Sequence, residues 1–97
     1  MPPSSDLQIR VQAIASGLVQ GVNYRWFVLE NAKEMSLRGW VRNLPDGRVE
    51  VEIEGEKQAV DKLIEAMRKG PMMAHVTGVA VVDLAYEGKY REFQVRY

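Results

Sequence analysis

GLVQGVNYR, residues 17–25, decides the fold because it converts a strand pattern into a helical one. Before it, residues 7–16 alternate apolar and mostly polar side chains with the period of two that a half-buried strand requires. After it, apolar side chains recur at helical spacing, which predicts a helix from residue 23 or 24 to residue 35. Gly17 and Gly21 bracket the connecting loop. The stretch therefore predicts a strand–loop–helix unit.

Turn signals divide the rest of the chain into further elements. Asp46-Gly47 predicts a hairpin turn, and Gly70-Pro71 predicts the end of a second helix. These patterns predict strands over residues 37–43, 48–54, 76–84 and 93–97 and a helix over residues 57–69. The order β-α-β-β-α-β with a terminal strand is that of the α+β ferredoxin-like sandwich. We expect an antiparallel four- or five-stranded sheet with two helices on one face.

Length and composition indicate one small folded domain. With 97 residues, of which 46% are hydrophobic and 27% charged, the chain can form one core but not two independent ones. We expect a flexible leader over residues 1–6 and a single domain over residues 7–97. No apolar run approaches the roughly 20 residues of a membrane span, and the leader lacks the pattern of a signal peptide. A cytoplasmic protein without a membrane partner is expected.

The counts of reactive and charged side chains exclude several kinds of chemistry. The absence of cysteine excludes disulfides, thiolate catalysis and cysteine-ligated metals. The single histidine, His75, makes a histidine metal site or a Ser–His hydrolase a weak hypothesis. The 13 basic and 13 acidic side chains balance, whereas a nucleic-acid-binding protein usually has a basic excess. We expect no metal, no cofactor and no nucleic-acid partner.

Two further predictions concern the strand faces and the tryptophans. Glu50, Glu52 and Glu54 alternate with apolar residues, which predicts a solvated sheet face. Trp26 and Trp40 are expected to pack within the fold, with Trp40 facing the core. The glutamates also occupy a strand on which RNA-recognition domains of the same element order carry aromatic residues, and this disfavours RNA binding.

The loop before the first helix has the properties of an anion site. Gly21 can adopt a positive φ and direct neighbouring N–H groups into one concavity, and the helix N-terminus adds a favourable dipole. Arg25 falls in the first helical turn, where a guanidinium can bind two phosphate oxygens. On the loop alone, a glycine-rich turn followed by a surface arginine is an equally good interpretation.

Asn43 is expected beside this loop although it is distant in sequence. The strands over residues 7–16 and 37–43 run parallel, because a helix crosses between them, so their C-terminal ends meet at one edge of the sheet. Asparagine before a turn is common for local hydrogen-bonding reasons. Beside an anion site, its amide could instead hold a water in line for attack on phosphorus.

GLVQGVNYR, GWVRN (residues 39–43), the Asp46-Gly47 turn and the Gly70-Pro71 pair together resemble the acylphosphatases, hydrolases of carboxyl-phosphate anhydrides. The similarity extends over roughly residues 7–97. It implies that Arg25 binds the phosphate and that Asn43 orients the attacking water. It also implies that a backbone cradle holds the phosphate, formed by Gln20, Gly21, Val22, Asn23 and Tyr24.

Two residues depart from the pattern of that family. Asn23 stands where glycine or an aromatic residue is common, and Ser36 where a glycine normally ends the first helix. Asparagine tolerates left-handed backbone conformations and could also cap the helix, so Asn23 is compatible with the loop. Ser36 in a left-handed conformation is expected to cost some stability.

The chemistry of an acyl phosphate explains why so few reactive residues suffice. Its leaving group is a carboxylate, whose conjugate acid has a pKa of roughly 4, so no general acid is needed. No residue is an obvious general base, and we expect a phosphate oxygen of the substrate to accept the proton of the water. Expected partners are an acyl phosphate and inorganic phosphate, as product and inhibitor, bound by a monomer. The alternative is a non-catalytic ferredoxin-like domain that binds a phosphate ligand or a protein.

Overall fold

The computed structural model describes residues 7–97, and the leader expected over residues 1–6 lies outside the described residues. The predicted element order is confirmed, and each boundary falls within two residues of its expected position. None of the helices in the described part of the chain is long and apolar enough to cross a membrane. The elements are β1 (Gln8–Leu18), α1 (Tyr24–Glu34), β2 (Arg38–Asn43), β3 (Val49–Glu56), α2 (Lys57–Lys69), β4 (His75–Leu84) and β5 (Phe93–Arg96).

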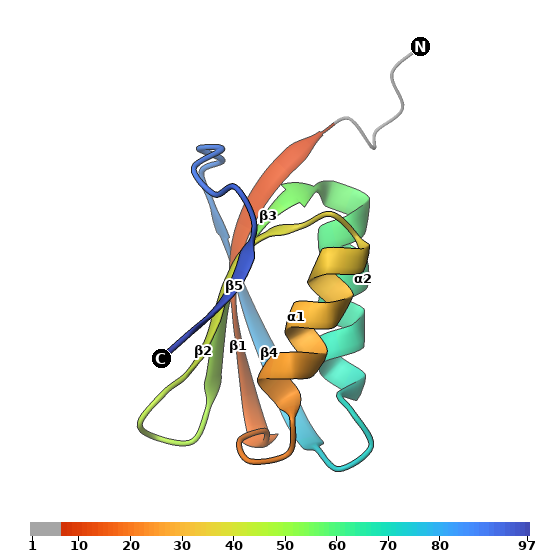
Figure 1. Ribbon diagram of the computed structural model, residues 1–97, viewed down its shortest axis with the longest axis vertical. Helices are drawn as coiled ribbons and strands as arrows, with labels where there is room; N and C mark the ends of the chain where they lie inside the picture. Colours follow the sequence, from red (N-terminus) through yellow and green to blue (C-terminus); the bar gives the residue numbers. More distant parts are fainter. Residues whose placement is uncertain (1–6) are drawn as a thin grey trace.

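The five strands form one sheet in the order β4-β1-β3-β2-β5, with both helices on one face (Figure 1). The four strands from β4 to β2 pair antiparallel, as expected. β5 pairs parallel with β2, so the complete sheet is mixed rather than wholly antiparallel. The reason is geometric: β4 runs opposite to β1 and β2, and the loop after it reverses the chain, so β5 runs in their direction.

The core lies between the helices and the β1–β3 centre of the sheet. Small and β-branched side chains alternate toward the helices and are paired across the two strands, as Val11 with Ile53 and Ala13 with Val51. These four side chains are at most 2% exposed. The apolar faces of both helices pack on them, contributing Val28, Ala32, Val60, Leu63 and Met67. The apolar face that recurs every second residue along the strands thus packs against the apolar faces that recur every 3.6 residues along the helices.

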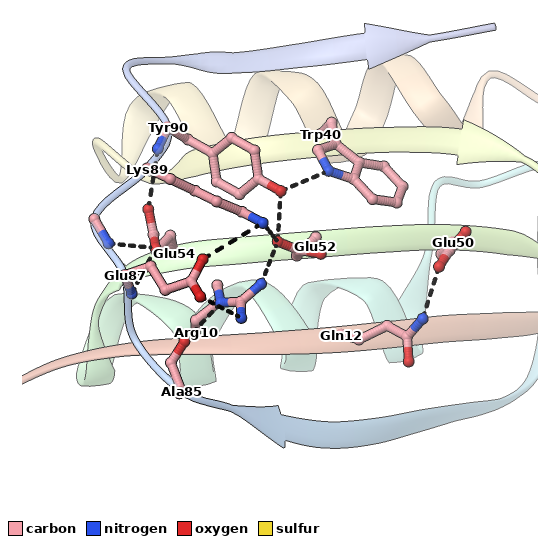
Figure 2. Close-up of polar contacts among 11 residues, drawn as sticks. Arg10, Gln12, Trp40, Glu50, Glu52, Glu54, Ala85, Glu87, Lys89 and Tyr90 are labelled. Atoms are coloured by element: carbon pink, nitrogen blue, oxygen red, sulfur yellow. Dashed lines mark hydrogen bonds and ion pairs between the residues drawn. The ribbon is translucent and has the colours of Figure 1, made fainter.

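The opposite face of the sheet is not the solvated surface that the sequence predicted. Glu54 is 0% and Glu50 only 9% exposed. Trp40 is 6% exposed but lies on this same face, across from Glu52, so it does not face the core as expected. The loop over residues 85–92, which joins β4 to β5, lies over the open face (Figure 2). The alternating pattern identified this face correctly but contained no information on what covers it.

Glu54 holds the β4–β5 loop by accepting backbone hydrogen bonds. Its carboxylate accepts the N–H groups of Glu87 and Tyr90, both at 3.3 Å, and that of Gly88 at 2.8 Å (Figure 2). A buried charge is costly unless it is paired or hydrogen-bonded, and here three peptide donors compensate it. The loop and the buried carboxylate therefore stabilise each other.

Glu52 forms a second polar cluster under the same loop. Arg10 donates to its carboxylate at 2.9 Å, and the Tyr90 hydroxyl donates to the same oxygen at 2.5 Å. The Trp40 indole N–H donates in turn to the Tyr90 oxygen at 3.0 Å (Figure 2). Burial opposes ionisation of Glu52, but the hydrogen bonds from Tyr90 and Arg10 and the nearby Lys89 charge hold its pKa below the usual value.

The end of α1 shows why glycine is favoured at position 36, where this chain has a serine. The Ser36 N–H donates to the Lys33 carbonyl at 3.1 Å, and the Leu37 N–H donates to the Ala32 carbonyl at 2.9 Å. These two bonds form a Schellman motif, whose first residue after the helix cap must be left-handed. Ser36 accordingly has φ 56°, a conformation that favours glycine.

Candidate active site

Three segments that are distant in sequence meet at one end of the sheet. They are the β1–α1 loop, the end of β2 and the end of β5 (Figure 1). Between them lies an open cavity of about 270 Å³. Its lining residues are Val19, Gly21, Asn23, Tyr24, Arg25, Trp26, Asn43, Val95 and Tyr97. The structure thus brings together Arg25 and Asn43, which the sequence predicted to share one edge of the sheet.

Close packing of strands fixes where the β1–α1 loop begins. The β1–β4 register shifts between Ser16 and Gly17, which marks a bulge. Gly17 has φ 113°, and a Cβ atom there would lie 2.1 Å from the His75 carbonyl oxygen. Only glycine fits this position, and the bulge lies just before β1 ends at Leu18 and the chain turns toward α1.

The loop enters α1 through two left-handed residues. Gly21 has φ 73° and Asn23 has φ 68° and ψ 21°, as their residue types allow. Asn23 occupies the N-cap position, but its side chain makes no capping hydrogen bond, contrary to the capping role considered for it. The Phe27 N–H donates to the Asn23 carbonyl at 3.0 Å. The preceding helical N–H groups have no intrahelical acceptor, which favours a bound anion.

Arg25 contributes a positive charge to the cavity wall. Its side chain is half-buried, and its guanidinium carbon lies 4.9 Å from the centroid of the Tyr97 ring. None of the ion pairs among residues 7–97 involves Arg25. The guanidinium is therefore held by an aromatic face and has no carboxylate that would compete with an anionic ligand.

Asn43 carries an unsatisfied hydrogen-bond acceptor. It is the last residue of β2, paired with Val49 of β3. Its Oδ1 atom is buried and has no hydrogen-bond partner among the described residues. Leaving a buried acceptor unpaired costs about 1–3 kcal/mol, and such atoms in native structures mark strained or functional positions. Asn43 itself lines the cavity, so its side-chain amide is the group at this strand end that can hydrogen-bond a molecule there.

The five residues expected to form the backbone cradle do not all line the cavity. Gly21, Asn23 and Tyr24 line it, whereas Gln20 and Val22 do not. Val22 instead packs against the hydrophobic core. Val22 lies between two left-handed residues, Gly21 and Asn23, both of which line the cavity.

Gln20 connects the loop to the β2–β3 turn. Its side-chain amide nitrogen donates to the Leu44 carbonyl at 2.7 Å and to the Arg48 carbonyl at 2.9 Å. Both carbonyls belong to the turn that begins directly after Asn43. Gln20 therefore holds the strand end that carries Asn43 against the loop that precedes Arg25, a role that the sequence did not indicate.

Tyr24 anchors the start of α1. Its ring is buried, and its hydroxyl donates to the Met67 carbonyl at 2.8 Å near the end of α2. Burial raises the pKa of the Tyr24 hydroxyl well above its usual value, so this group stays protonated. Its side chain therefore positions the helix, and the residue also lines the cavity.

Four lining residues are not among the site residues predicted from the sequence, namely Val19, Trp26, Val95 and Tyr97. Trp26 was expected to pack within the fold, but it is 55% exposed at the cavity. Helical spacing was a usable signal, because Trp26 lies off the apolar stripe that contains Val28 and Ala32. No local signal identified Val95 or Tyr97, since their position depends on the pairing of β5 with β2.

No carboxylate or imidazole side chain lines the cavity. Among residues 7–97, no three histidine, cysteine, aspartate or glutamate side chains are grouped to hold a metal ion. The lining residues with polar side-chain groups are one arginine, two asparagines, two tyrosines and one tryptophan. This set can bind and orient an anion and a water.

A ferredoxin-like sheet with a polar cavity beside its first β–α loop places this protein in the class of small α+β sandwiches with a candidate site at that loop. The acylphosphatase family model matches residues 11–95, and the chain belongs to this family. It is 50% identical over 86 residues to the acylphosphatase of Chlorobaculum tepidum, covering 89% of this chain and 94% of that protein. The Methylococcus capsulatus acylphosphatase is 49% identical with the same coverage.

A solved structure shows the same fold. The crystal structure of acylphosphatase from Bacillus subtilis superposes with a TM-score of 0.89 at 34% sequence identity. The match covers 94% of this chain and 100% of that one. The expected ferredoxin-like architecture and family membership are therefore confirmed.

Proposed function

We propose that the protein hydrolyses acyl phosphates to a carboxylate and inorganic phosphate. The N–H groups at the start of α1 and the Arg25 guanidinium bind the phosphoryl oxygens. A water held by Asn43 attacks phosphorus. The bond between phosphorus and the oxygen that links it to the acyl carbon breaks, and the carboxylate leaves with the electron pair. Catalysis then consists of positioning and electrostatic stabilisation.

The observation that carries this proposal is the buried, unpartnered Oδ1 of Asn43 in the same cavity as Arg25. An acceptor in this position can fix one proton of the attacking water and direct its lone pair toward phosphorus. A non-catalytic phosphate site would require Arg25 and the backbone donors but not this acceptor. The unsatisfied amide therefore favours hydrolysis over simple binding.

The second proton of the water passes to a phosphoryl oxygen of the substrate. The absence of carboxylate and imidazole side chains from the cavity lining supports this assignment. We expect the pH dependence of kcat/KM to follow ionisation of the substrate. If substitution of an enzyme side chain shifted the pH profile of kcat/KM for the same substrate, this route would be contradicted.

The central test is a benzoyl phosphate assay in the presence of a chelator. Arg25→Ala should raise KM and the inhibition constant of inorganic phosphate and lower kcat/KM by about 100-fold or more, because it removes a charge-assisted contact. Asn43→Ala should lower kcat by a similar factor with little change in phosphate inhibition, since it affects the water rather than the anion. Arg91→Ala, an exposed arginine outside the cavity, is the matched control.

Hydrolysis at the parent rate by both cavity variants would show that the site is elsewhere. Phosphate binding without turnover by the parent would favour the non-catalytic alternative. We also propose that the enzyme needs no metal ion, and full activity in the presence of the chelator would support this. The proposal further includes that the protein is a cytoplasmic monomer and binds no nucleic acid. The balance of 13 basic and 13 acidic side chains supports the absence of nucleic-acid binding, and size-exclusion chromatography tests the monomer.

A further inference from the structure

The cavity has two kinds of lining, and the proposed phosphate site accounts for only one. Gly21, Asn23, Arg25 and Asn43 provide the polar part. The remaining apolar surface includes Trp26, which is 55% exposed, and Tyr97, which is almost fully exposed. A large apolar side chain left in solvent loses the free energy that burial would provide.

Trp26 does not have a packing role that would explain its position. It lies off the apolar stripe of α1 and is absent from the hydrophobic core and from the residues packed against it. Its indole N–H has no hydrogen-bond partner among residues 7–97, unlike that of Trp40, which bonds to Tyr90. The ring is thus available to a ligand at the mouth of the cavity.

The geometry of the proposed reaction shows which part of the ligand reaches this surface. In an in-line displacement, the attacking water and the leaving carboxylate lie on opposite sides of phosphorus. The phosphoryl group and the water occupy the polar lining, where Arg25 and Asn43 are. The acyl group must therefore extend away from Asn43 toward the rest of the cavity wall, whose exposed aromatic residues are Trp26 and Tyr97.

We propose that Trp26, together with Tyr97, forms an acyl-group subsite that makes the protein selective for acyl phosphates with aromatic or bulky apolar acyl groups. This inference rests on the proposed function. A benzoyl ring can stack on or meet the edge of the indole, whereas the methyl group of acetyl phosphate makes few contacts with it. Contacts between aromatic rings of this kind change relative binding by about 3- to 10-fold.

The test compares kcat/KM for benzoyl phosphate and acetyl phosphate in four proteins: the parent, Trp26→Ala, Trp26→Phe and Tyr86→Ala. Tyr86 is an exposed aromatic residue of the β4–β5 loop outside the cavity, and it serves as the matched control. The inhibition constant of inorganic phosphate is measured for each, because phosphate has no acyl group.

We expect Trp26→Ala to lower the benzoyl-to-acetyl ratio by about 3- to 10-fold, because kcat/KM falls much more for benzoyl phosphate than for acetyl phosphate, and phosphate inhibition should change least. Trp26→Phe should retain most of the ratio, and Tyr86→Ala all of it. An unchanged ratio in Trp26→Ala, or equal losses with both substrates, would overturn the subsite alone. A parent protein that hydrolyses neither compound would overturn the proposed function and the subsite with it.

Discussion

Two left-handed residues that are not glycine, Asn23 and Ser36, lie at the two ends of α1. Asparagine adopts this conformation at low cost, whereas serine does so less readily. Asn23 shapes the loop at the cavity, and Ser36 only closes the helix. The same backbone requirement therefore has a functional consequence at one end and a purely energetic one at the other.

Ser36→Gly should stabilise the protein. Glycine removes the left-handed penalty of about 1 kcal/mol, partly offset by the greater entropy of its unfolded chain, so we expect a net gain of about 0.5 kcal/mol. For a domain of this size, that corresponds to an increase in Tm of about 2–4 °C. Thermal unfolding followed by circular dichroism measures it.

Ser36→Ala is the control, because alanine keeps a Cβ atom in the same conformation and should give no gain. An equal rise in Tm for the alanine and glycine variants would show that the left-handed conformation is not the source of the effect. Activity should be unchanged in both, since Ser36 lies outside the cavity.

The β4–β5 loop is the element whose role the sequence concealed most. It carries no apolar run and would ordinarily be a mobile connection. Here it crosses the open sheet face and reaches the edge where β5 pairs with β2, and β5 in turn carries Val95 of the cavity lining (Figure 2). Its attachment to Glu54 therefore connects the buried polar face with the far end of the sheet.

Glu54→Gln should loosen this loop. The amide retains one acceptor oxygen but presents donors to the backbone N–H groups of Gly88 and its neighbours, so we expect a loss of about 1–3 kcal/mol. Hydrogen exchange should accelerate first at the amides of Glu87, Gly88 and Tyr90, because these lose their acceptor. Uniform acceleration over the whole sheet, with no excess at these amides, would contradict a local role for Glu54.

Glu65→Gln makes the same chemical change on the exposed face of α2 and is the control for Glu54→Gln. It should alter neither the stability nor the exchange pattern. The comparison separates the loss of a specific acceptor from a change in net charge.

At the scale of the whole molecule, stability should fall in acid because of Glu52. Its folded-state pKa is held below the unfolded value of about 4.3, mainly by Tyr90 and Arg10 against the opposing effect of burial. The unfolded state therefore binds more protons in this range. The stabilisation is complete above about pH 5 and is lost as pH falls through the folded-state pKa.

Urea unfolding between pH 7 and pH 3 tests this prediction. Glu52→Gln should be less stable than the parent at pH 7 and show a shallower decline on the acid side. Tyr90→Phe, which removes one hydrogen bond to Glu52 and keeps the ring, should give an intermediate slope. Equal slopes for the parent and Glu52→Gln would exclude Glu52 as a source of the acid sensitivity.

Local patterns in the sequence were sufficient for the element order, the strand faces toward the helices and the juxtaposition of Arg25 with Asn43. The reason is that these follow from periodicity, turn chemistry and the direction of consecutive strands. The left-handed Asn23 and Ser36 likewise depend on residue type and near neighbours, whereas the bulge at Gly17 depends on the close approach of His75 in β4. The local constraints can be recognised from residue type and local sequence pattern.

Only the tertiary structure decided the burial of Glu54, the exposure of Trp26, the Gln20 tether and the parallel pairing of β5. The Glu54 carboxylate is bonded to backbone groups 33 to 36 positions further along the chain, and Gln20 to carbonyls 24 and 28 positions away. Such contacts depend on where the folded chain places a loop, which no local pattern encodes. The sequence by itself determined the secondary-structure elements and the proximity of Arg25 and Asn43. Long-range packing determined which other residues surround these two side chains.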